Sequence, residues 1–356
     1  MKDNLRLIVL DNFKDVGNKV NKHLQNIYNT NKSFIIPIDE VRFDNGEGKV
    51  VINDTIREKD VYILSDIGNY SCTYKMYDFV NHKSPDDHFQ DLKRVIYAIK
   101  GEAENIHVVT PLVYQARQNK RQSRESLDCA LGLQDLAKLN VKNIVAFDVH
   151  DKGMQNAIPL NSLENFYPTS TILQEFIKNE KIDLNNVLII SPDTGAVDRA
   201  KAYADIFRCN VGMFYKSRDL TKVVNGKNPI MEHKYIGEDV NKKIAIVIDD
   251  IISSGETMLD VATSLKKLGA SKVYLISTFA LFTKGIDKFD KAYKEKLFEK
   301  VYSTNLTYVS DEITNKNWFV KVDCSSQIAK IIEHLHDKLS LTDLLDDWKS
   351  ICKEIK

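Results

Sequence analysis

The sequence has no excess of either charge and few cysteines. Lys plus Arg and Asp plus Glu both total 50, so the formal net charge at pH 7 is zero. Nonspecific nucleic-acid binding depends on basic side chains that neutralise phosphates, so this composition argues against it. The five cysteines are odd in number, widely separated and form no C-x-x-C pair. This pattern excludes a disulfide framework and indicates a reduced, cytoplasmic protein.

Long hydrophobic runs are missing as well. The N-terminal stretch MKDNLRLIVL has only a four-residue apolar run before Asp11, which is too short for a secretory signal peptide. The most apolar later segment, VYLISTFALF at 273–282, is about half the length that a transmembrane helix requires. We therefore expect a protein that neither crosses a membrane nor binds nucleic acid.

What the sequence does contain is a series of short, apolar, β-rich runs alternating with helical patterns. Its 356 residues exceed one ordinary domain and suit two. Nearly continuous apolar strands separated by helices predict mainly parallel sheets covered on both faces, which is an α/β fold. The expected strands are 5–10, 33–38, 61–64, 106–111, 144–149, 187–192, 211–216, 244–249 and 274–281, with weaker patterns at 306–310 and 319–323.

The boundary between two α/β domains is expected near residues 160–168, where Pro159 and Pro168 interrupt the pattern. The tail differs, because it has the apolar stripes of two amphipathic helices at 325–337 and 340–355. We expect these helices to pack on the body of the protein or on another subunit. The predicted division is an N-terminal α/β domain at 1–166, a C-terminal α/β domain at 167–324, and C-terminal helices at 325–356 that pack on the N-terminal domain.

The stretch IVIDDIISSGETML at 246–259 ends an apolar strand with two adjacent aspartates. In an open parallel sheet, ligands bind past the carboxyl ends of strands, where the next helix begins. Backbone N–H groups from Ser253 to Thr257 can converge on an anion there, and Gly255 permits the tight bend. Asp249 and Asp250 can grip vicinal hydroxyls or a magnesium ion. A sugar phosphate satisfies both halves of the loop.

Two readings of this loop compete. No G-K-[ST] is present, so it is not a Walker loop, and an acid pair that ends a strand and caps a helix is a common structural feature. The full pattern of apolar strand, Asp-Asp, two apolar residues, small hydroxyls, Gly and Thr nevertheless resembles the phosphoribosyl-diphosphate loop of the type I phosphoribosyltransferase fold. That resemblance implies ribose hydroxyls on Asp249 and Asp250, and a 5-phosphate on Ser253, Ser254, Gly255, Glu256 and Thr257.

Further motifs specify a family. Together with this loop, and in this order along residues 40–285, they resemble ribose-phosphate diphosphokinase (phosphoribosyl-diphosphate synthetase). The resemblance implies two phosphoribosyltransferase-like domains, one of them accounting for the length beyond a single transferase domain. The motifs are FDNGE at 43–47, ARQ at 116–118, FDVHD at 147–151, IISPDTGAVDRA at 189–200 and FYKSRD at 214–219.

The resemblance also implies roles for single residues. Phe43, Asn45 and Glu47 match the loop of a neighbouring subunit that holds the adenine of ATP. Arg117 and Gln118 match residues that contact the phosphates and ribose of ATP. These five residues form the expected ATP site.

Residues between 150 and 218 carry the remaining implied roles. His150 and Asp193 match residues that hold or contact the magnesium of MgATP. Lys216 and Arg218 match the basic pair of a mobile loop that closes on the transferring group, so they are the expected catalytic residues. The segment associated with the diphosphate contributes Asp193, Thr194, Gly195 and Arg199.

Four positions depart from the family pattern. Asn45 replaces the usual Asp, Ala196 a usual Gly, and Ser253 and Glu256 fall where the family has Asp and Gly. Glu256 is compatible with the phosphate only if its carboxylate points outward while its backbone N–H faces the anion. In the first helical turn, such a carboxylate is favourable.

The implied reaction is transfer of the diphosphate of MgATP to the 1-hydroxyl of ribose 5-phosphate, giving AMP and 5-phosphoribosyl 1-diphosphate. The resemblance also implies Mg²⁺ and homo-oligomers, commonly hexamers built from dimers. One alternative is a non-catalytic regulatory paralogue, and another is a nucleobase phosphoribosyltransferase, against which the second domain and its motifs argue. Singly, His150 reads as a structural histidine, Arg117 as part of a solvated basic face, and Asp193 as a helix cap.

Overall fold

The computed structural model describes residues 3–121, 123–218 and 230–345, with the side chains of 216–218 and 230–233 excepted. The chain folds into two compact units. Within the described residues, unit 1 consists of 3–168, 305–310 and 323–345. Unit 2 consists of the remaining described residues of 169–304 together with 311–322.

Unit 1 is built on a five-stranded parallel sheet. Apolar residues fill its strands almost continuously, as expected for a sheet covered on both faces. Helices α1 (Lys14–Ile27), α2 (Pro85–Ile99), α3 (Asp128–Lys138) and α9 (Ser325–His336) flank it, with short helices η1 (Asp11–Phe13) and η2 (Lys152–Ala157). The strand order is β1 (Leu5–Val9), β4 (Asp60–Leu64), β7 (Asn105–Val109), β8 (Val141–Phe147) and β9 (Ser162–Phe166).

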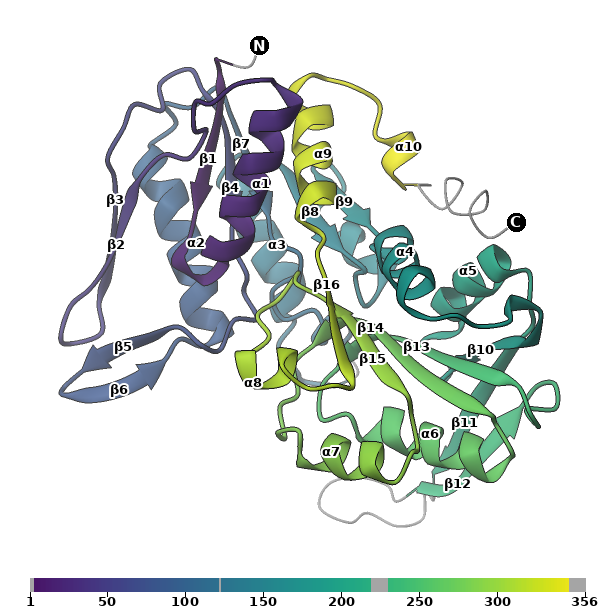
Figure 1. Cartoon of the computed structure of the whole chain (residues 1–356). Coiled ribbons are helices and arrows are strands. Elements are labelled where there is room, and N and C mark those ends of the chain that lie inside the picture. The colour runs from purple at the N-terminus through teal and green to yellow at the C-terminus, as the bar shows by residue number, and fades with distance from the viewer. Residues whose placement is uncertain (1–2, 122, 219–229, 346–356) are drawn as a thin grey trace. The chain divides into compact units, whose positions relative to one another are not determined.

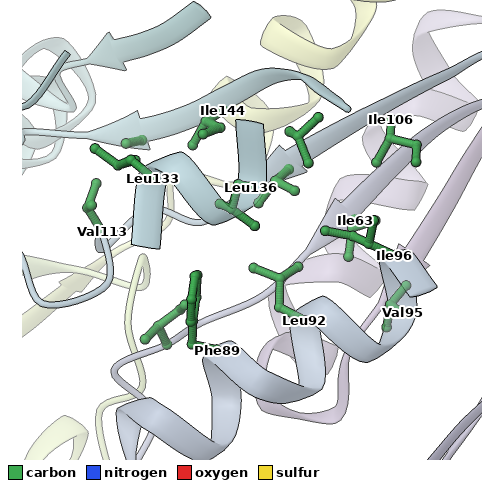
Figure 2. Close-up of a cluster of buried hydrophobic side chains, with 14 of the residues drawn as sticks. Ile63, Phe89, Leu92, Val95, Ile96, Ile106, Val113, Leu133, Leu136 and Ile144 are labelled. Carbon is green, nitrogen blue, oxygen red and sulfur yellow. The ribbon is translucent and has the colours of Figure 1, made fainter. Parts of the chain in front are cut away.

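The main core of unit 1 lies between the sheet and helices α2 and α3. Helix α2 begins at a capping box in which Ser84 and Asp87 satisfy each other's backbone N–H groups, with Pro85 at its first position. Its apolar face then packs on the strands. Figure 2 shows side chains from both helices and the sheet meeting in one cluster, among them Ile63, Phe89, Leu92, Ile96, Ile106, Leu133, Leu136 and Ile144.

Two antiparallel hairpins extend from unit 1 on the same side (Figure 1). Strands β2 (Ile38–Arg42) and β3 (Gly48–Ile52) form the first, and β5 (Thr73–Met76) and β6 (Phe79–His82) form the second. The residues between β2 and β3 are the FDNGE motif. Neither hairpin was among the expected strands.

Unit 2 is built on a seven-stranded sheet that is parallel except for its first pair. Its order is β12 (Ile230–Ile236), β11 (Val211–Arg218), β10 (Val187–Ser191), β13 (Ile244–Ile252), β14 (Lys272–Ala280), β15 (Lys300–Thr304) and β16 (Phe319–Val322). The central strand β13 is nearly all buried. The flanking helices are α4 (Thr169–Asn179), η3 (Leu184–Asn186), α5 (Val197–Phe207), α6 (Glu256–Lys267), α7 (Asp287–Lys294) and α8 (Asp311–Thr314).

These two mainly parallel sheets flanked by helices confirm the predicted α/β fold class. The strand expected at 306–310 is wrong: the strand is β15 at Lys300–Thr304, and the following residues return to unit 1. Residues 33–38 contribute only the bridge between Leu7 and Ile35 and the start of β2.

The C-terminal tail begins with α9, which lies beside α1 within unit 1 (Figure 1). Of the helix expected at 340–355, the structure has α10 (Thr342–Leu345), and the residues after 345 lie outside the described part. Among the helices of the described residues, none combines the length and apolarity needed to cross a membrane.

Candidate functional site

The acid pair lies at the carboxyl end of β13, the central strand of unit 2. Apolar neighbours on β10 and β14 bury the strand, while its last turn leads directly into α6. Asp250 is 6% exposed and donates its backbone N–H to Asp249 Oδ1 over 2.9 Å. Two carboxylates are thereby held at the edge of the sheet where ligands of such folds bind.

Charge at this edge comes from three carboxylates and one guanidinium. Arg199 on α5 places Nη2 3.8 Å from Asp250 Oδ2, and both side chains are largely buried. Burial raises the pKa of Asp249 well above its usual value, the carboxylates of Asp250 and Asp193 raise that pKa further, and Arg199 lowers it. The structure therefore brings together four residues that the sequence assigned to the sugar and diphosphate sites.

The loop between β13 and α6 has the backbone of an anion cradle. Gly255 adopts φ +78°, a conformation that favours glycine. A Cβ at this position would also lie 2.2 Å from Phe289 Cε2 on α7, so the backbone and the packing both require glycine here. The carbonyl of Ser253 accepts the N–H of Thr283 over 2.9 Å, which fixes the start of the loop. The N-terminal N–H groups of α6 follow, and such groups lack intrahelical partners.

Glu256 is the first residue of α6 and its side chain is 59% exposed. Its Oε1 accepts a hydrogen bond of 2.6 Å from Lys288 Nζ on α7. Its backbone N–H points to Ser254 Oγ at 3.4 Å. The acid that the sequence introduces beside the cradle is thus paired with a cation of the neighbouring helix.

Asp193 follows β10 and shapes the turn into α5. Its Oδ1 accepts the N–H groups of Gly195 and Ala196 at 2.8 and 3.2 Å. These bonds close the turn that precedes α5 and do not cap the helix, whose N-cap is Ala196 with no side-chain cap bond. Thr194 and Gly195 are exposed at this turn. Ala196 is buried, so its methyl group faces the interior.

Lys216 and Arg218 fall on β11, the strand next to β10. The backbone of Lys216 pairs with His233 of β12, and the register shifts between Ser217 and Arg218. Their side chains lie outside the part of the chain that the structure describes.

In unit 1, the turn between β2 and β3 carries Phe43, Asn45 and Glu47. The side chain of Asn45 donates to Glu47 Oε2 over 3.0 Å and accepts the Glu47 N–H over 3.1 Å. An aspartate at position 45 would lack the first of these bonds and would place two carboxylates side by side. Phe43 is 47% exposed and its ring is accessible.

The other predicted ATP residues follow β7 and β8 in unit 1. Arg117 and Gln118 lie in an exposed turn after β7, and His150 is exposed after β8. An ion pair of 2.7 Å between Lys120 Nζ and Asp151 Oδ2 ties the two segments together. The hydrogen bond from Lys120, with that of the Gly153 N–H, lowers the pKa of Asp151.

The donors present suit magnesium that is held mainly by phosphate. Among the described residues, no group of three or more His, Cys, Asp or Glu side chains is arranged to hold a metal ion. Magnesium usually keeps several waters and binds through one or two carboxylates plus substrate phosphates. The carboxylates of Asp193, Asp249 and Asp250 in unit 2 are donors of the right type for that sparse role.

Two basic residues near the predicted site were missed. Lys288 is 32 positions from Glu256 in the chain, and no sequence signal links them. Arg42 directly precedes the FDNGE motif, and that adjacency was a usable signal. Its guanidinium donates to the carbonyl of Gly46 inside the turn.

Comparison with known proteins gives two matching family models. Residues 5–139 match the N-terminal domain of ribose phosphate pyrophosphokinase, and residues 168–320 match the phosphoribosyl transferase domain. Ribose-phosphate pyrophosphokinase 2 of Schizosaccharomyces pombe is 28% identical over 306 residues, covering 85% of this chain and 88% of that protein. Ribose-phosphate pyrophosphokinase of Mycoplasmopsis pulmonis is 28% identical over 313 residues, covering 86% and 88%.

A solved structure has the same fold. Phosphoribosylpyrophosphate synthetase from Mycobacterium smegmatis superposes with a TM-score of 0.76 at 19% identity, covering 94% of this chain and 99% of that one. The similarity therefore extends over both units.

Proposed function

Because the chain belongs to the ribose-phosphate pyrophosphokinase family, we propose that it transfers the diphosphate of ATP to the 1-hydroxyl of ribose 5-phosphate. The products are AMP and 5-phosphoribosyl 1-diphosphate, which serves nucleotide biosynthesis. The observation that carries the proposal is the edge of unit 2, where Asp249 and Asp250 adjoin a glycine-bent loop at the N-terminus of α6. Hydroxyls and a phosphate of one sugar phosphate fit these two halves.

Each group in unit 2 has a defined task in this proposal. The carboxylates of Asp249 and Asp250 accept hydrogen bonds from the ribose hydroxyls, and the backbone N–H groups of 253–257 hold the 5-phosphate. Burial and Asp250 raise the pKa of Asp249, and the positive charge of Arg199 lowers it, so Arg199 favours the ionised form of the acid pair. The sugar is thereby oriented with its 1-hydroxyl free to attack.

The transfer itself is an in-line displacement. The sugar O1 loses its proton to solvent and forms a bond to the β-phosphorus of ATP. The bond from that phosphorus to the α-phosphate oxygen breaks, and AMP leaves. Negative charge spreads over phosphoryl oxygens, so positioning and neutralisation supply most of the rate increase. Lys216 and Arg218 are assigned to that neutralisation, and magnesium, when bound with ATP, shields the phosphate charges.

ATP is assigned to unit 1, with Phe43, Asn45 and Glu47 on the adenine and Arg117 and Gln118 on the phosphates and ribose. His150 and Asp193 are assigned to the magnesium that accompanies ATP. A homo-oligomer in which a neighbouring subunit supplies the adenine turn completes the proposal.

The test is incubation of the purified protein with MgATP and ribose 5-phosphate, with AMP and 5-phosphoribosyl 1-diphosphate measured together. Equal amounts of both products support the proposal. ATP binding without any AMP above background would overturn it and favour a non-catalytic paralogue, consistent with the departures at Asn45, Ser253 and Glu256. Formation of a nucleotide from added nucleobase and 5-phosphoribosyl 1-diphosphate would instead support a phosphoribosyltransferase.

A further inference from the structure

Arg42 connects the turn 43–47 to helix α2. It is the last residue of β2, and its side chain is 11% exposed. Nη1 donates to the carbonyl of Gly46 over 3.1 Å, and Nη2 donates to both carboxylate oxygens of Asp91 at 3.1 and 3.0 Å. One planar guanidinium thus holds the backbone of the turn and a buried carboxylate of α2 at once, through two nitrogens whose fixed geometry a lysine ammonium lacks.

Arg42 belongs to a larger buried charge network. Lys83, at the base of the β5–β6 hairpin, contacts Asp91 at 2.9 Å and Glu40 of β2 at 3.2 Å. The carboxylates of Glu40 and Asp91 raise the pKa of Lys83 although burial alone would lower it. Buried charges persist only when paired, so the network fixes β2 and the hairpin base on α2. Its members are Glu40, Arg42, Lys83, Asp87, Asp91 and Arg94.

The β5–β6 hairpin supports the same turn from its tip. The N–H of Tyr77 donates to the carbonyl of Asp44 over 2.9 Å. Met76 lies under Gly46, since a Cβ on Gly46 would be 2.7 Å from Met76 Sδ. The Tyr74 ring lies 4.8 Å from the guanidinium carbon of Arg42. Figure 1 shows the two hairpins on the same side of unit 1.

An isolated two-stranded hairpin is marginally stable in water, so the contacts at its base and tip define its place. The inner side chains Tyr74 and Met76 are half-buried against the turn, whereas Lys75 on the other face is exposed. The hairpin therefore contacts the turn through its inner face.

We propose that Arg42 is a positioning residue and the β5–β6 hairpin a brace, which together hold the turn 43–47 in the one conformation that reads the adenine of ATP. This inference rests on the proposed function in taking ATP as the ligand of the turn. A turn that is already ordered loses less conformational freedom on binding, so bracing strengthens nucleotide binding and base selectivity. Ribose 5-phosphate binding and the transfer step do not depend on it.

The test compares Arg42→Lys and Met76→Ala with the wild type and with Lys75→Gln, a control on the outer face of the same hairpin. Arg42→Lys keeps the charge of the network and loses the bond to Gly46. We expect each of the two variants to raise the KM for ATP about tenfold and to reduce the preference for ATP over GTP. The KM for ribose 5-phosphate and kcat should stay within about twofold of the wild type. Lys75→Gln should match the wild type.

Two results would overturn the proposal. One is an unchanged KM for ATP with unchanged base preference in both variants; the other is an equal rise in both KM values, which indicates a general loss of structure. Calorimetric binding of α,β-methylene-ATP separates this proposal from the proposed function. If the wild type makes no AMP yet binds the analogue, weaker binding by the variants still supports the brace and equal binding refutes it. A wild type that does not bind the analogue refutes both.

Discussion

The Nζ atom of Lys288 lies 2.6 Å from Oε1 of Glu256, at the point where α6 begins behind the anion loop. Both side chains are more than half exposed, so the pair contributes little to stability. Its effect is on the field at the loop, because the ammonium offsets a carboxylate beside the expected 5-phosphate. The acid at the first position of α6 thereby has its own counter-charge.

Lys288→Ala should raise the KM for ribose 5-phosphate by about two- to fourfold at low ionic strength, in keeping with the small energies of exposed ion pairs. The rise should shrink at high salt, because salt screens exposed charges. In a Glu256→Gln background, the same substitution should have no such effect. Lys291→Ala removes an equal charge from the same helix and should leave this KM unchanged. Steady-state kinetics of the four variants measures this KM. An equal rise in KM in both backgrounds would show that Lys288 acts without Glu256.

Arg199→Gln should shift the acid limb of the pH profile of kcat/KM for ribose 5-phosphate upward, by about one pH unit. Burial and the carboxylates of Asp250 and Asp193 already raise the pKa of Asp249, and Arg199 is the group that lowers it. Its removal disfavours the ionised acid pair, so activity is lost at a higher pH on acidification. Arg208→Gln, an equal loss of charge at the exposed end of α5, should leave the profile in place. Coincident profiles for wild type and Arg199→Gln would contradict the assignment.

Gly255→Ala should lower the free energy of unfolding of unit 2 by about 1–3 kcal/mol more than Gly285→Ala. Both glycines have positive φ, but a Cβ on Gly285 meets nothing within 4 Å, whereas one on Gly255 lies 2.2 Å from Phe289. The difference therefore isolates the clash from the backbone strain. Trp318 stacks on Phe289 with ring centroids 5.5 Å apart, so its fluorescence in a Trp348→Phe background reports the melt. Equal losses for the two variants would mean that Phe289 yields without cost.

The α/β fold was predictable because its strands are apolar runs. Such runs can be identified from the local sequence alone, without knowledge of which strands they pair with. The segment 306–310 was not predictable, since its β-branched and aromatic residues favour a strand while the tertiary structure uses them otherwise. The N–H of Tyr308 donates to the buried carboxylate of Asp66 over 2.7 Å instead of to a neighbouring strand. The two hairpins were missed because tertiary contacts also determine their structure. One such contact joins one hairpin to the other, from the N–H of Tyr77 to the carbonyl of Asp44.

The candidate site divides in the same way. Asp249, Asp250 and Gly255 lie in one short motif, and the fold delivers them together as the motif predicts. Arg42 of β2 donates to Asp91 of α2, and Lys288 of α7 donates to Glu256 of α6. Each contact therefore joins residues of two different elements. A local sequence pattern indicates which ligand a loop can bind. The charged groups that contact the loop from other elements are determined by how those elements pack.

Lys216→Ala should lower kcat by a few hundredfold while ribose 5-phosphate binding is retained. Loss of one donor to the charge that develops in the transition state costs about 3 kcal/mol. Lys272→Ala, a substitution at the exposed start of β14, supplies the control. Rapid-quench measurement of AMP formation, with calorimetry for the sugar phosphate, gives both quantities. Turnover at the wild-type rate would remove Lys216 from the mechanism.

Asp66 should make unit 1 less stable as pH rises from about 4 to 7. Burial raises its pKa to about 7 from a usual 3.8, although the N–H groups of Tyr308 and Gly68 and the Thr307 hydroxyl lower that pKa in part. The unfolded chain therefore releases this proton at lower pH than the folded chain, and stability falls between the two values. At about 1.4 kcal/mol per pH unit, the total is at most about 4 kcal/mol.

Asp66→Asn cannot ionise and should remove this component of the pH dependence, whatever its effect on stability at pH 4. Asp15→Asn, at an exposed carboxyl of α1, should keep it. Urea unfolding at pH 4, 5, 6 and 7 measures the slope. Hydrogen exchange of the Tyr308 amide, corrected for its intrinsic pH dependence, locates the change at the contact with segment 305–310. The same slope in wild type and Asp66→Asn would show that Asp66 is ionised across this range and stabilised by its three donors.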